Sequence, residues 1–241
     1  MPPGPGLEAI AAEMKSAQDG ARQIEPLTAR HPGFDLAAAY EVAHRVHRAR
    51  LAEGARPLGR KIGFTNPAIW DEYGVREPVW GYLYDGTVVR LAGTQASCRL
   101  GRFAEPKLEP EIVLGLRAAP RPGAGIPELA GAIEWVAHGF EIVQSHFPGW
   151  KFRAPDTAAD QGLHGALLVG PPQPLAALGP DPAATLESFT LDLACDGRQV
   201  ERGRGSNVLG SPLAALAHLV SVLARQGAPL GAGELVTTGT L

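Results

Sequence analysis

The order of the apolar segments is the feature that most constrains how this chain can fold. Strand-like runs at residues 79–91 and 111–116 follow one another without a helical segment between them. Helix-like segments occur near the two ends and once in the middle of the chain, so they do not alternate regularly with the strands. A doubly wound sheet or a TIM barrel needs strands and helices in regular alternation, so both are disfavoured. The pattern favours a mainly β core with flanking helices, which is an α+β fold.

Helical periodicity marks the amino end and two later segments. Apolar side chains recur at helical spacing in residues 7–18 and 35–53, and a Ser-Pro start and a glycine stop bound a helix over residues 211–226. A further helix is predicted for residues 126–139, leading directly into a strand. A DG pair at Asp196 predicts a hairpin.

These segments predict an N-terminal helical region at residues 1–56 and a β-rich core at residues 57–241, in one compact unit.

Charge and cysteine content argue against several classes of function. The chain has 22 basic and 25 acidic residues, and no Lys/Arg cluster is longer than a pair. A nucleic-acid or anionic-membrane surface is therefore unsupported, and a small-molecule partner is expected. Two cysteines that are far apart in the sequence indicate a reducing compartment. Because neither a signal sequence nor an uncharged apolar span is evident, we expect a cytoplasmic protein without a membrane segment.

Two glutamates flank Pro110 within a run that otherwise resembles a buried strand. In an extended chain Glu109 and Glu111 point the same way, about 7 Å apart at roughly 3.3 Å rise per residue. Such a pair could share one cation, and the alternative is a solvated strand face. Pro110 cannot donate a ladder hydrogen bond, so we expect this strand to be at a sheet edge or irregular at that point.

Two further charged residues in apolar surroundings favour a metal site. Glu141 heads an apolar strand, where a lone carboxylate is costly unless it is paired or bound to a metal. Three carboxylates would suit Mg²⁺ or Mn²⁺, which prefer oxygen ligands. Lys61 lies in the apolar segment "GRKIGFTN", so a partly buried ammonium facing a carboxylate is expected. The alternative is an ordinary surface lysine on a strand.

Three segments, in order, resemble one family: "GRKIGFTN", "PKLEPEIVLGL" and "FEIVQSHFPGWKFRAPDTAADQGLHGALLVG". They are similar to the 2-keto-4-pentenoate hydratase and 4-oxalocrotonate decarboxylase group of the fumarylacetoacetate hydrolase superfamily. The resemblance implies a mixed β-roll with N-terminal helices, and Mg²⁺ or Mn²⁺ held by Glu109, Glu111 and Glu141. Family members continue with strand sequence past the position of Leu241, so we expect that C-terminal strands of the core are missing here. A homo-oligomer is also expected.

The resemblance also implies roles for other residues. Lys61 is expected in the catalytic pocket, and Thr240, in the final "TGT", is expected to face the substrate. Gln161 replaces a shorter amide of the family and is a candidate substrate contact. Lys151 and Asp160 match family positions and are expected to support the site from behind.

His164 is the most notable departure from the family pattern. The hydratases usually have "VADNAS" where this chain has "AADQGLH". His164 is a candidate general acid or base, since a histidine titrates near neutral pH, and the alternative is a satisfied structural residue. A second departure, "QSH" in place of "DSR", lies after Glu141. Because both motifs differ from those of the hydratases, the sequence does not identify the substrate.

The implied chemistry is a lyase reaction on a 2-oxo acid. A metal-bound 2-oxo acid is an electron sink, because the cation stabilises the charge that develops on the keto oxygen. Water can then add to a conjugated alkene, so hydration of a 2-hydroxypenta-2,4-dienoate-like compound of aromatic catabolism is the first expectation. An acylpyruvate-type C–C hydrolase and a 2-oxo acid decarboxylase could use the same metal. A catalytically silent partner subunit is the alternative of another class.

Overall fold

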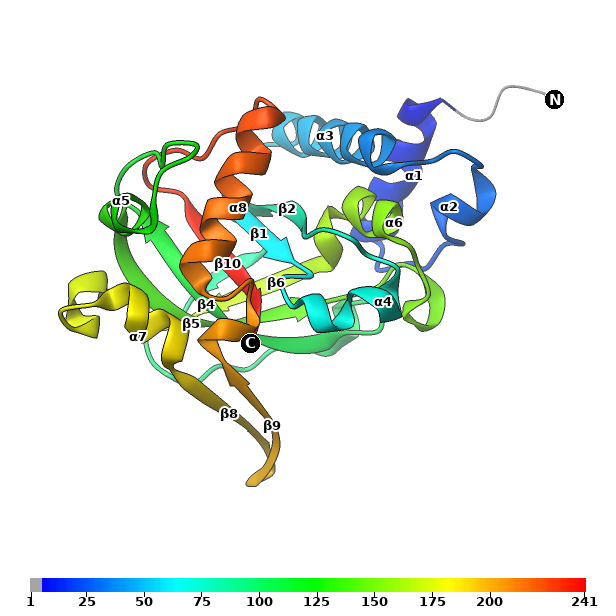
Figure 1. Ribbon diagram of the computed structural model, residues 1–241. Helices are drawn as coiled ribbons and strands as arrows, with labels where there is room; N and C mark the ends of the chain where they lie inside the picture. Colours follow the sequence, from blue (N-terminus) through cyan, green and yellow to red (C-terminus); the bar gives the residue numbers. More distant parts are fainter. Residues whose placement is uncertain (1–5) are drawn as a thin grey trace.

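A mixed β-sheet forms the centre of the protein, with helices packed around it (Figure 1). The computed structural model describes residues 6–241, so the first five residues of the predicted helical region lie outside it. The strand order is β2-β1-β10-β4-β5-β6-β3, and β7 pairs with β5. The strands of this sheet are β1 (Pro57–Gly63), β2 (Val79–Tyr84), β3 (Val88–Arg90), β4 (Lys107–Leu116), β5 (Ile133–Val143), β6 (His164–Val169), β7 (Gln173–Pro174) and β10 (Leu235–Thr240).

The sheet curls because a tight turn joins the two strands at the ends of its strand order. β2 ends at Tyr84 and β3 begins at Val88, and the amide of Thr87 donates to the Tyr84 carbonyl at 3.0 Å. A flat sheet could not bring these two strands so close, so the sheet must roll. The β1–β10 and β3–β6 pairs are parallel and the neighbouring pairs are antiparallel. The expected mixed β-roll is thereby confirmed.

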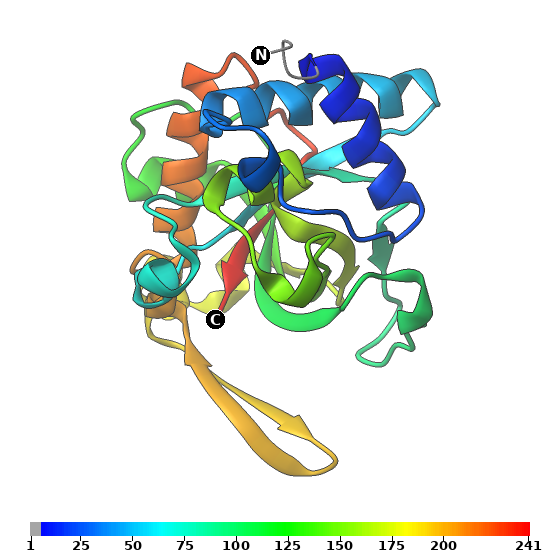
Figure 2. The same cartoon turned by 90° about the vertical axis from the view of Figure 1, so that its right-hand side faces the viewer.

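Helices cover the roll on two sides (Figures 1 and 2). Met14, Leu27 and Val42 of the amino-terminal helices are fully buried in one cluster with Phe147 and Leu163 of the core. The boundary predicted at residue 57 stays a prediction, but the two parts share this cluster. The helices are α1 (Leu7–Asp19), α2 (Leu27–Arg30), α3 (Leu36–Ala52), α4 (Trp70–Tyr73), α5 (Ile126–Gly131), α6 (Ala154–Ala159), α7 (Pro182–Ser188) and α8 (Pro212–Arg225).

α8 is the most apolar helix of the protein's carboxyl-terminal part. The stretch Gly205–Arg225 is long and apolar enough to cross a membrane by length and composition, with a mean hydropathy of 1.6. However, Leu213, Leu216 and Leu219 are completely buried within the main hydrophobic cluster. Its apolar character therefore reflects core packing.

The helix predicted over residues 126–139 is wrong in its second half. α5 ends at Gly131, and β5 begins at Ile133 and pairs with β4 as far as Val143. Side chains that matched a helical period are buried between strands instead, because cross-strand pairing outweighs a weak local preference. Glu141 therefore lies inside a strand and does not head one.

β4 is an interior strand, so the first alternative predicted for Pro110, a sheet edge, is wrong, and the second, an irregular pairing, is confirmed. β4 lies between β10 and β5. The irregularity that proline requires is supplied by β10, whose register against β4 shifts between Thr237 and Thr240. The Pro110 carbonyl accepts from the amide of Leu241 at 3.2 Å beside this bulge.

The predicted hairpin at Asp196 is confirmed. β8 (Thr190–Cys195) and β9 (Arg198–Arg204) pair only with each other and project from the body of the protein (Figure 2). Asp196 and Gly197 both have positive φ, of 50° and 76°, as the favoured two-residue hairpin turn requires.

Candidate metal centre

Three glutamates on two neighbouring strands bring their carboxylates together inside the roll. Glu109 and Glu111 lie on β4, and Glu141 lies directly opposite Glu109 on β5. Because alternate residues of a strand share a face, the two β4 acids point the same way and Pro110 points away. One oxygen from each of the three lies within 4.8 Å of the others. The structure thus brings together the three acids that the sequence singled out.

Two of these acids are buried with oxygens that lack a hydrogen-bond partner. Glu111 is 1% exposed and Glu141 is fully buried. The amide of Gly239 donates to Glu111 Oε2 at 3.0 Å, and Glu111 Oε1 has no hydrogen-bond partner among the described residues. Glu141 Oε2 accepts no hydrogen bond there either, but it lies 3.2 Å from the ammonium of Lys61. Buried carboxylate oxygens are costly without a donor or a cation. An all-oxygen set of this kind fits Mg²⁺ or Mn²⁺.

Lys61 supplies one buried positive charge to this group. Its ammonium lies 3.2 Å from Glu141 Oε2 and donates to the carbonyl of Gly162 at 2.8 Å. Two glycines leave room for the side chain: a Cβ on Gly63 would lie 2.9 Å from Lys61 Nζ, and one on Gly162 would lie 2.8 Å from its Cδ. Three carboxylates and one ammonium leave two negative charges, which one divalent cation would balance.

The proton equilibria of the group follow from its burial and its charges. Burial raises the pKa of Glu109 to about 7 against the opposing effect of Lys61. Burial and the neighbouring Glu141 raise the pKa of Glu111. Burial alone would also raise the pKa of Glu141, but Lys61 and the hydrogen bond with His164 outweigh it and lower that pKa to about 2. Glu141 and Lys61 therefore form the charged pair, and Glu109 and Glu111 hold protons that a cation would displace.

His164 contacts Glu141 from the side opposite Lys61. Its Nδ1 lies 2.7 Å from Glu141 Oε1, and its Nε2 lies 2.9 Å from Thr87 Oγ1. His164 lines a separate cavity of about 510 Å³ and does not line the one that contains Lys61. This geometry favours positioning of the Glu141 carboxylate, and the general acid or base role stays a prediction. No sequence pattern marked Thr87 as part of this site.

A cavity of about 170 Å³ opens beside the acids. Its polar residues include Lys61, Glu109 and Thr240, and the substrate contact expected of Thr240 stays a prediction. The opposite wall is aromatic, and the rings of Tyr73 and Phe152 stack at 5.6 Å. The aromatic residues that line the cavity are Phe64, Tyr73, Trp150 and Phe152. The pocket is therefore lined by charged residues and by aromatic residues.

Gln161 and Lys151 do not reach this pocket. The Gln161 side chain accepts from the amide of Tyr82 and donates to the carbonyl of Ala43, both at 3.1 Å. Both ends of its amide are thereby used to join β2 to α3, so the expected substrate contact is not available to it in this structure. Lys151 is exposed and does not line the cavity. Its expected support of the site is not seen in the structure.

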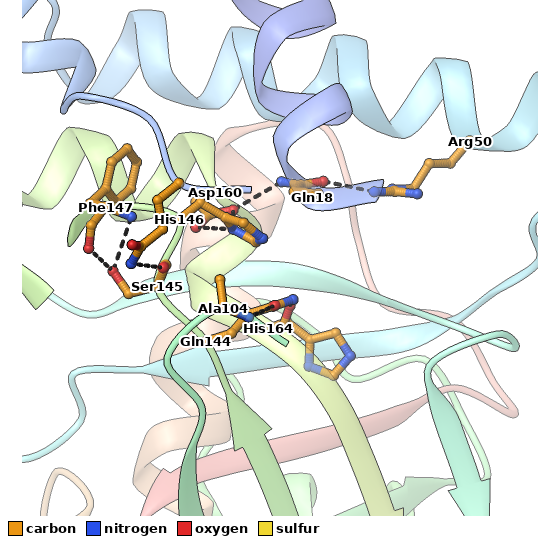
Figure 3. Close-up of polar contacts among 10 residues, drawn as sticks. Gln18, Arg50, Ala104, Gln144, Ser145, His146, Phe147, Asp160 and His164 are labelled. Carbon is orange, nitrogen blue, oxygen red and sulfur yellow. Dashed lines mark hydrogen bonds and ion pairs between the residues drawn. The ribbon is translucent and has the colours of Figure 1, made fainter. Parts of the chain in front are cut away.

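Asp160 lies in a separate buried network (Figure 3). Both of its carboxylate oxygens lie 2.8 Å from His146 Nδ1, and Gln18 donates to it at 3.1 Å. Arg50 in turn donates to Gln18 at 2.8 Å. This network ties α1 and α3 to the start of the turn at residues 160–163, whose Gly162 carbonyl holds Lys61. Asp160 therefore does not contact the three acids in this network, and it helps to hold the turn whose carbonyl accepts from Lys61.

Two backbone groups complete the site and were not found from the sequence. The Gly162 carbonyl accepts from Lys61, and the Gly239 amide donates to Glu111. Gly239 has a φ of 95° within the β10 bulge, a conformation that favours glycine. The glycine of "TGT" was the available signal for this amide, and no side-chain pattern marks the carbonyl.

Curated proteins resemble this chain along almost its whole length. A 2-hydroxyhexa-2,4-dienoate hydratase of Comamonas testosteroni is 32% identical over 98% of this chain and 87% of its own length. A 2-keto-4-pentenoate hydratase of Paraburkholderia phymatum is 34% identical, with the same two coverages.

A solved structure and a family model agree with these relatives. The 4-oxalocrotonate decarboxylase of Pseudomonas putida G7, complexed with magnesium and adipate, superimposes with a TM-score of 0.88. It is 27% identical and the match covers 98% of this chain and 87% of that one. The family model described as fumarylacetoacetate (FAA) hydrolase, C-terminal, matches residues 75–241. The chain therefore belongs to the fumarylacetoacetate hydrolase family.

Proposed function

We propose that this protein is a divalent-metal-dependent lyase acting on a 2-oxo acid, and that it hydrates a 2-keto-4-pentenoate-like compound in aromatic catabolism. The observation that carries the proposal is the convergence of Glu109, Glu111 and Glu141 beside the buried ammonium of Lys61. Relatives named as hydratases of short unsaturated 2-oxo acids support the reaction class.

Glu109, Glu111 and Glu141 would hold the cation, Mg²⁺ or Mn²⁺. When bound, it supplies stabilisation for the negative charge that develops on the keto oxygen of the substrate. The protein's part is to keep three carboxylates together in a site with little water. The β4–β5 pairing and the Gly239 amide do this for Glu109, Glu141 and Glu111.

Lys61 is the residue best placed to act on the substrate. Its ammonium forms an ion pair with Glu141 Oε2 at 3.2 Å and donates to the Gly162 carbonyl at 2.8 Å, and an ammonium has three N–H donors, so a donor remains for the pocket. That donor would neutralise the substrate carboxylate or move a proton. Thr240, on the same cavity, would contact the substrate through its hydroxyl.

The size and walls of the pocket suit a short unsaturated acid. A cavity of about 170 Å³ is small for an organic ligand site, and its aromatic wall would pack against a flat, apolar tail. A 2-oxo acid decarboxylase is the second candidate, because the solved structure that resembles this chain at a TM-score of 0.88 is a decarboxylase. Both reactions use the same electron sink.

We further propose that the protein acts as a homo-oligomer in the cytoplasm. Leu108 and Phe140, on neighbouring strands β4 and β5, are 47% and 39% exposed, which suits a contact between subunits. Cys98 and Cys195 are free thiols, as a reducing compartment favours.

Product analysis tests the reaction. The purified protein with Mg²⁺ is offered an unsaturated 2-oxo acid, an acylpyruvate and an unsaturated 2-oxo dicarboxylic acid, and products are identified by NMR in H₂¹⁸O. The proposal expects a 4-hydroxy-2-oxo acid carrying ¹⁸O, and no turnover with excess chelator. Release of CO₂ as the main reaction would favour the decarboxylase, and cleavage to pyruvate would indicate the hydrolase. Metal binding without turnover of any substrate would favour a silent partner subunit.

A further inference from the structure

A threonine hydroxyl in the metal pocket is buried and has no partner. Thr65 is 1% exposed and lines the same cavity as Lys61 and Thr240. Its Oγ1 makes no hydrogen bond within the described part of the chain. A hydroxyl buried in this way destabilises the fold unless something bonds to it. Thr65 therefore brings a hydroxyl without a hydrogen-bond partner to the wall of this pocket.

The backbone around Thr65 holds the side chain in place. Phe64 has a φ of 55°, a strained conformation for a residue with a Cβ, and the indole of Trp70 donates to its carbonyl at 2.7 Å. The Thr65 carbonyl accepts from the amide of Leu209 at 2.9 Å. Strain of this kind persists only where the surroundings fix it, so the position of Thr65 in the pocket is set by the fold.

The Thr65 hydroxyl packs against the β10 bulge next to the acids. A Cβ built on Gly239 would lie 1.9 Å from Thr65 Oγ1, so only glycine permits this approach. The amide of the same Gly239 donates to Glu111 Oε2. Thr65 is thereby held near the metal-binding acids by a residue that contacts both. Because ionised carboxylates only accept, the hydroxyl is a donor in a part of the site rich in acceptors.

We infer that Thr65 Oγ1 donates a hydrogen bond to a carboxylate oxygen of the 2-oxo acid and positions it in the pocket. The inference rests on the proposed function. The reacting end of a 2-oxo acid has one keto oxygen and two carboxylate oxygens. A single cation can bind the keto oxygen and the carboxylate oxygen on the same side. The remaining carboxylate oxygen needs donors from the protein, and Thr65 is a fixed, unused one beside Lys61.

Binding of oxalate to the Mg²⁺-loaded protein tests the inference by calorimetry. Thr65→Val keeps the shape of the side chain and removes the hydroxyl, and Thr65→Ser restores it. We expect Thr65→Val to weaken oxalate binding about tenfold or more and Thr65→Ser to bind nearly as well as wild type. Mg²⁺ affinity should be unchanged in both variants. With substrate, Thr65→Val should raise KM more than it lowers kcat, and its ligand-free Tm should rise because an unpaired buried hydroxyl is gone.

Thr237→Val is the matched control. Thr237 is also fully buried with an unpartnered hydroxyl, but it does not line the pocket, so this variant should bind oxalate as wild type does. Wild-type oxalate affinity in Thr65→Val, or an equal loss in Thr237→Val, would overturn the inference and leave the proposed function intact. A wild-type protein that binds neither Mg²⁺ nor oxalate would overturn both.

Discussion

The buried ion pair between Lys61 and Glu141 is the residue-scale feature on which the site depends. Lys61 is 2% exposed, and its contacts within the described chain include Glu141 and the Gly162 carbonyl. Removing one partner of such a pair leaves a buried charge uncompensated. We expect Lys61→Met to lower the free energy of unfolding without metal by about 3 kcal/mol, measured by urea denaturation. Added Mg²⁺ should restore part of the loss, because it neutralises the same carboxylates.

Lys107→Met is the control for this prediction. Lys107 is exposed, and its ammonium lies 4.0 Å from the centre of the Trp150 ring. Such an exposed cation–π contact is worth about 0.5–1 kcal/mol, so this variant should lose no more than that. Equal losses in the two lysine variants would contradict the buried pair.

A substitution at His164 distinguishes two roles for this residue, positioning of Glu141 and general acid or base catalysis. If it positions Glu141, His164→Ala should weaken Mg²⁺ binding about 10- to 100-fold, as loss of a partner behind a metal ligand does. If it acts as a general acid or base, kcat should fall while Mg²⁺ affinity is kept. The geometry predicts the first result, and calorimetry together with kinetics measures both. Thr87→Val removes the outer contact of His164 together with two hydrogen bonds between the Thr87 hydroxyl and the Tyr84 backbone, and it should have a smaller effect on Mg²⁺ binding in the same direction.

The sequence identified candidate site residues where a charged residue lies among apolar ones. Glu109, Glu111 and Lys61 were identifiable because each is a charged residue in a strand-like run. Thr65 and Thr87 were not, because a threonine in a strand or turn is unremarkable until its neighbours are known. Gln161 was misjudged for a related reason, since its amide serves two backbone groups that only the fold brings near.

At the scale of elements, the turn at residues 160–163 positions Lys61. Gly162 has φ 65° and ψ 28°, and an added Cβ would meet Lys61 Cδ at 2.8 Å. Gly74 has nearly the same backbone, with φ 62° and ψ 24°, and open space around it. Gly74→Ala should therefore cost only the left-handed strain of about 1–2 kcal/mol. Gly162→Ala should cost more and should also abolish turnover, as thermal unfolding and kinetics would show. Equal costs and retained activity in both variants would argue against this role of the turn.

The helices and strands were predictable to different degrees for physical reasons. The helices α3 and α8 begin with side-chain caps: Asp35 accepts from the Ala38 amide at 2.9 Å, and Ser211 accepts from the Ala214 amide at 3.1 Å. The sequence of β5 contains no comparable local signal, and β5 is a strand because it pairs with β4. Likewise the interior place of β4 depends on the β10 bulge, formed with residues more than a hundred positions away.

At the scale of the whole molecule, the buried acids make stability depend on pH and metal. Burial raises the pKa of Glu109 to about 7, so the folded protein without metal binds a proton there that the unfolded chain releases near pH 4.5. Stability from this group is fully present below pH 4.5 and is lost as pH rises through about 7. Mg²⁺ prefers the ionised group, so the rise in Tm caused by Mg²⁺ should be larger at pH 8 than at pH 6.

Glu109→Gln isolates the contribution of this one carboxyl group. The variant cannot titrate at position 109, so the fall in metal-free Tm between pH 5 and pH 8 should be smaller than in wild type. An unchanged pH profile would show that Glu109 does not carry the predicted proton.

The central claim is that three carboxylates from β4 and β5 form one divalent-metal site. Calorimetric titration of Mg²⁺ into wild type and into the Glu109→Gln, Glu111→Gln double variant tests it most directly. We expect one Mg²⁺ per chain in wild type and no measurable binding in the double variant, with the fold retained by circular dichroism. Mg²⁺ binding at wild-type affinity in the folded double variant would contradict the account.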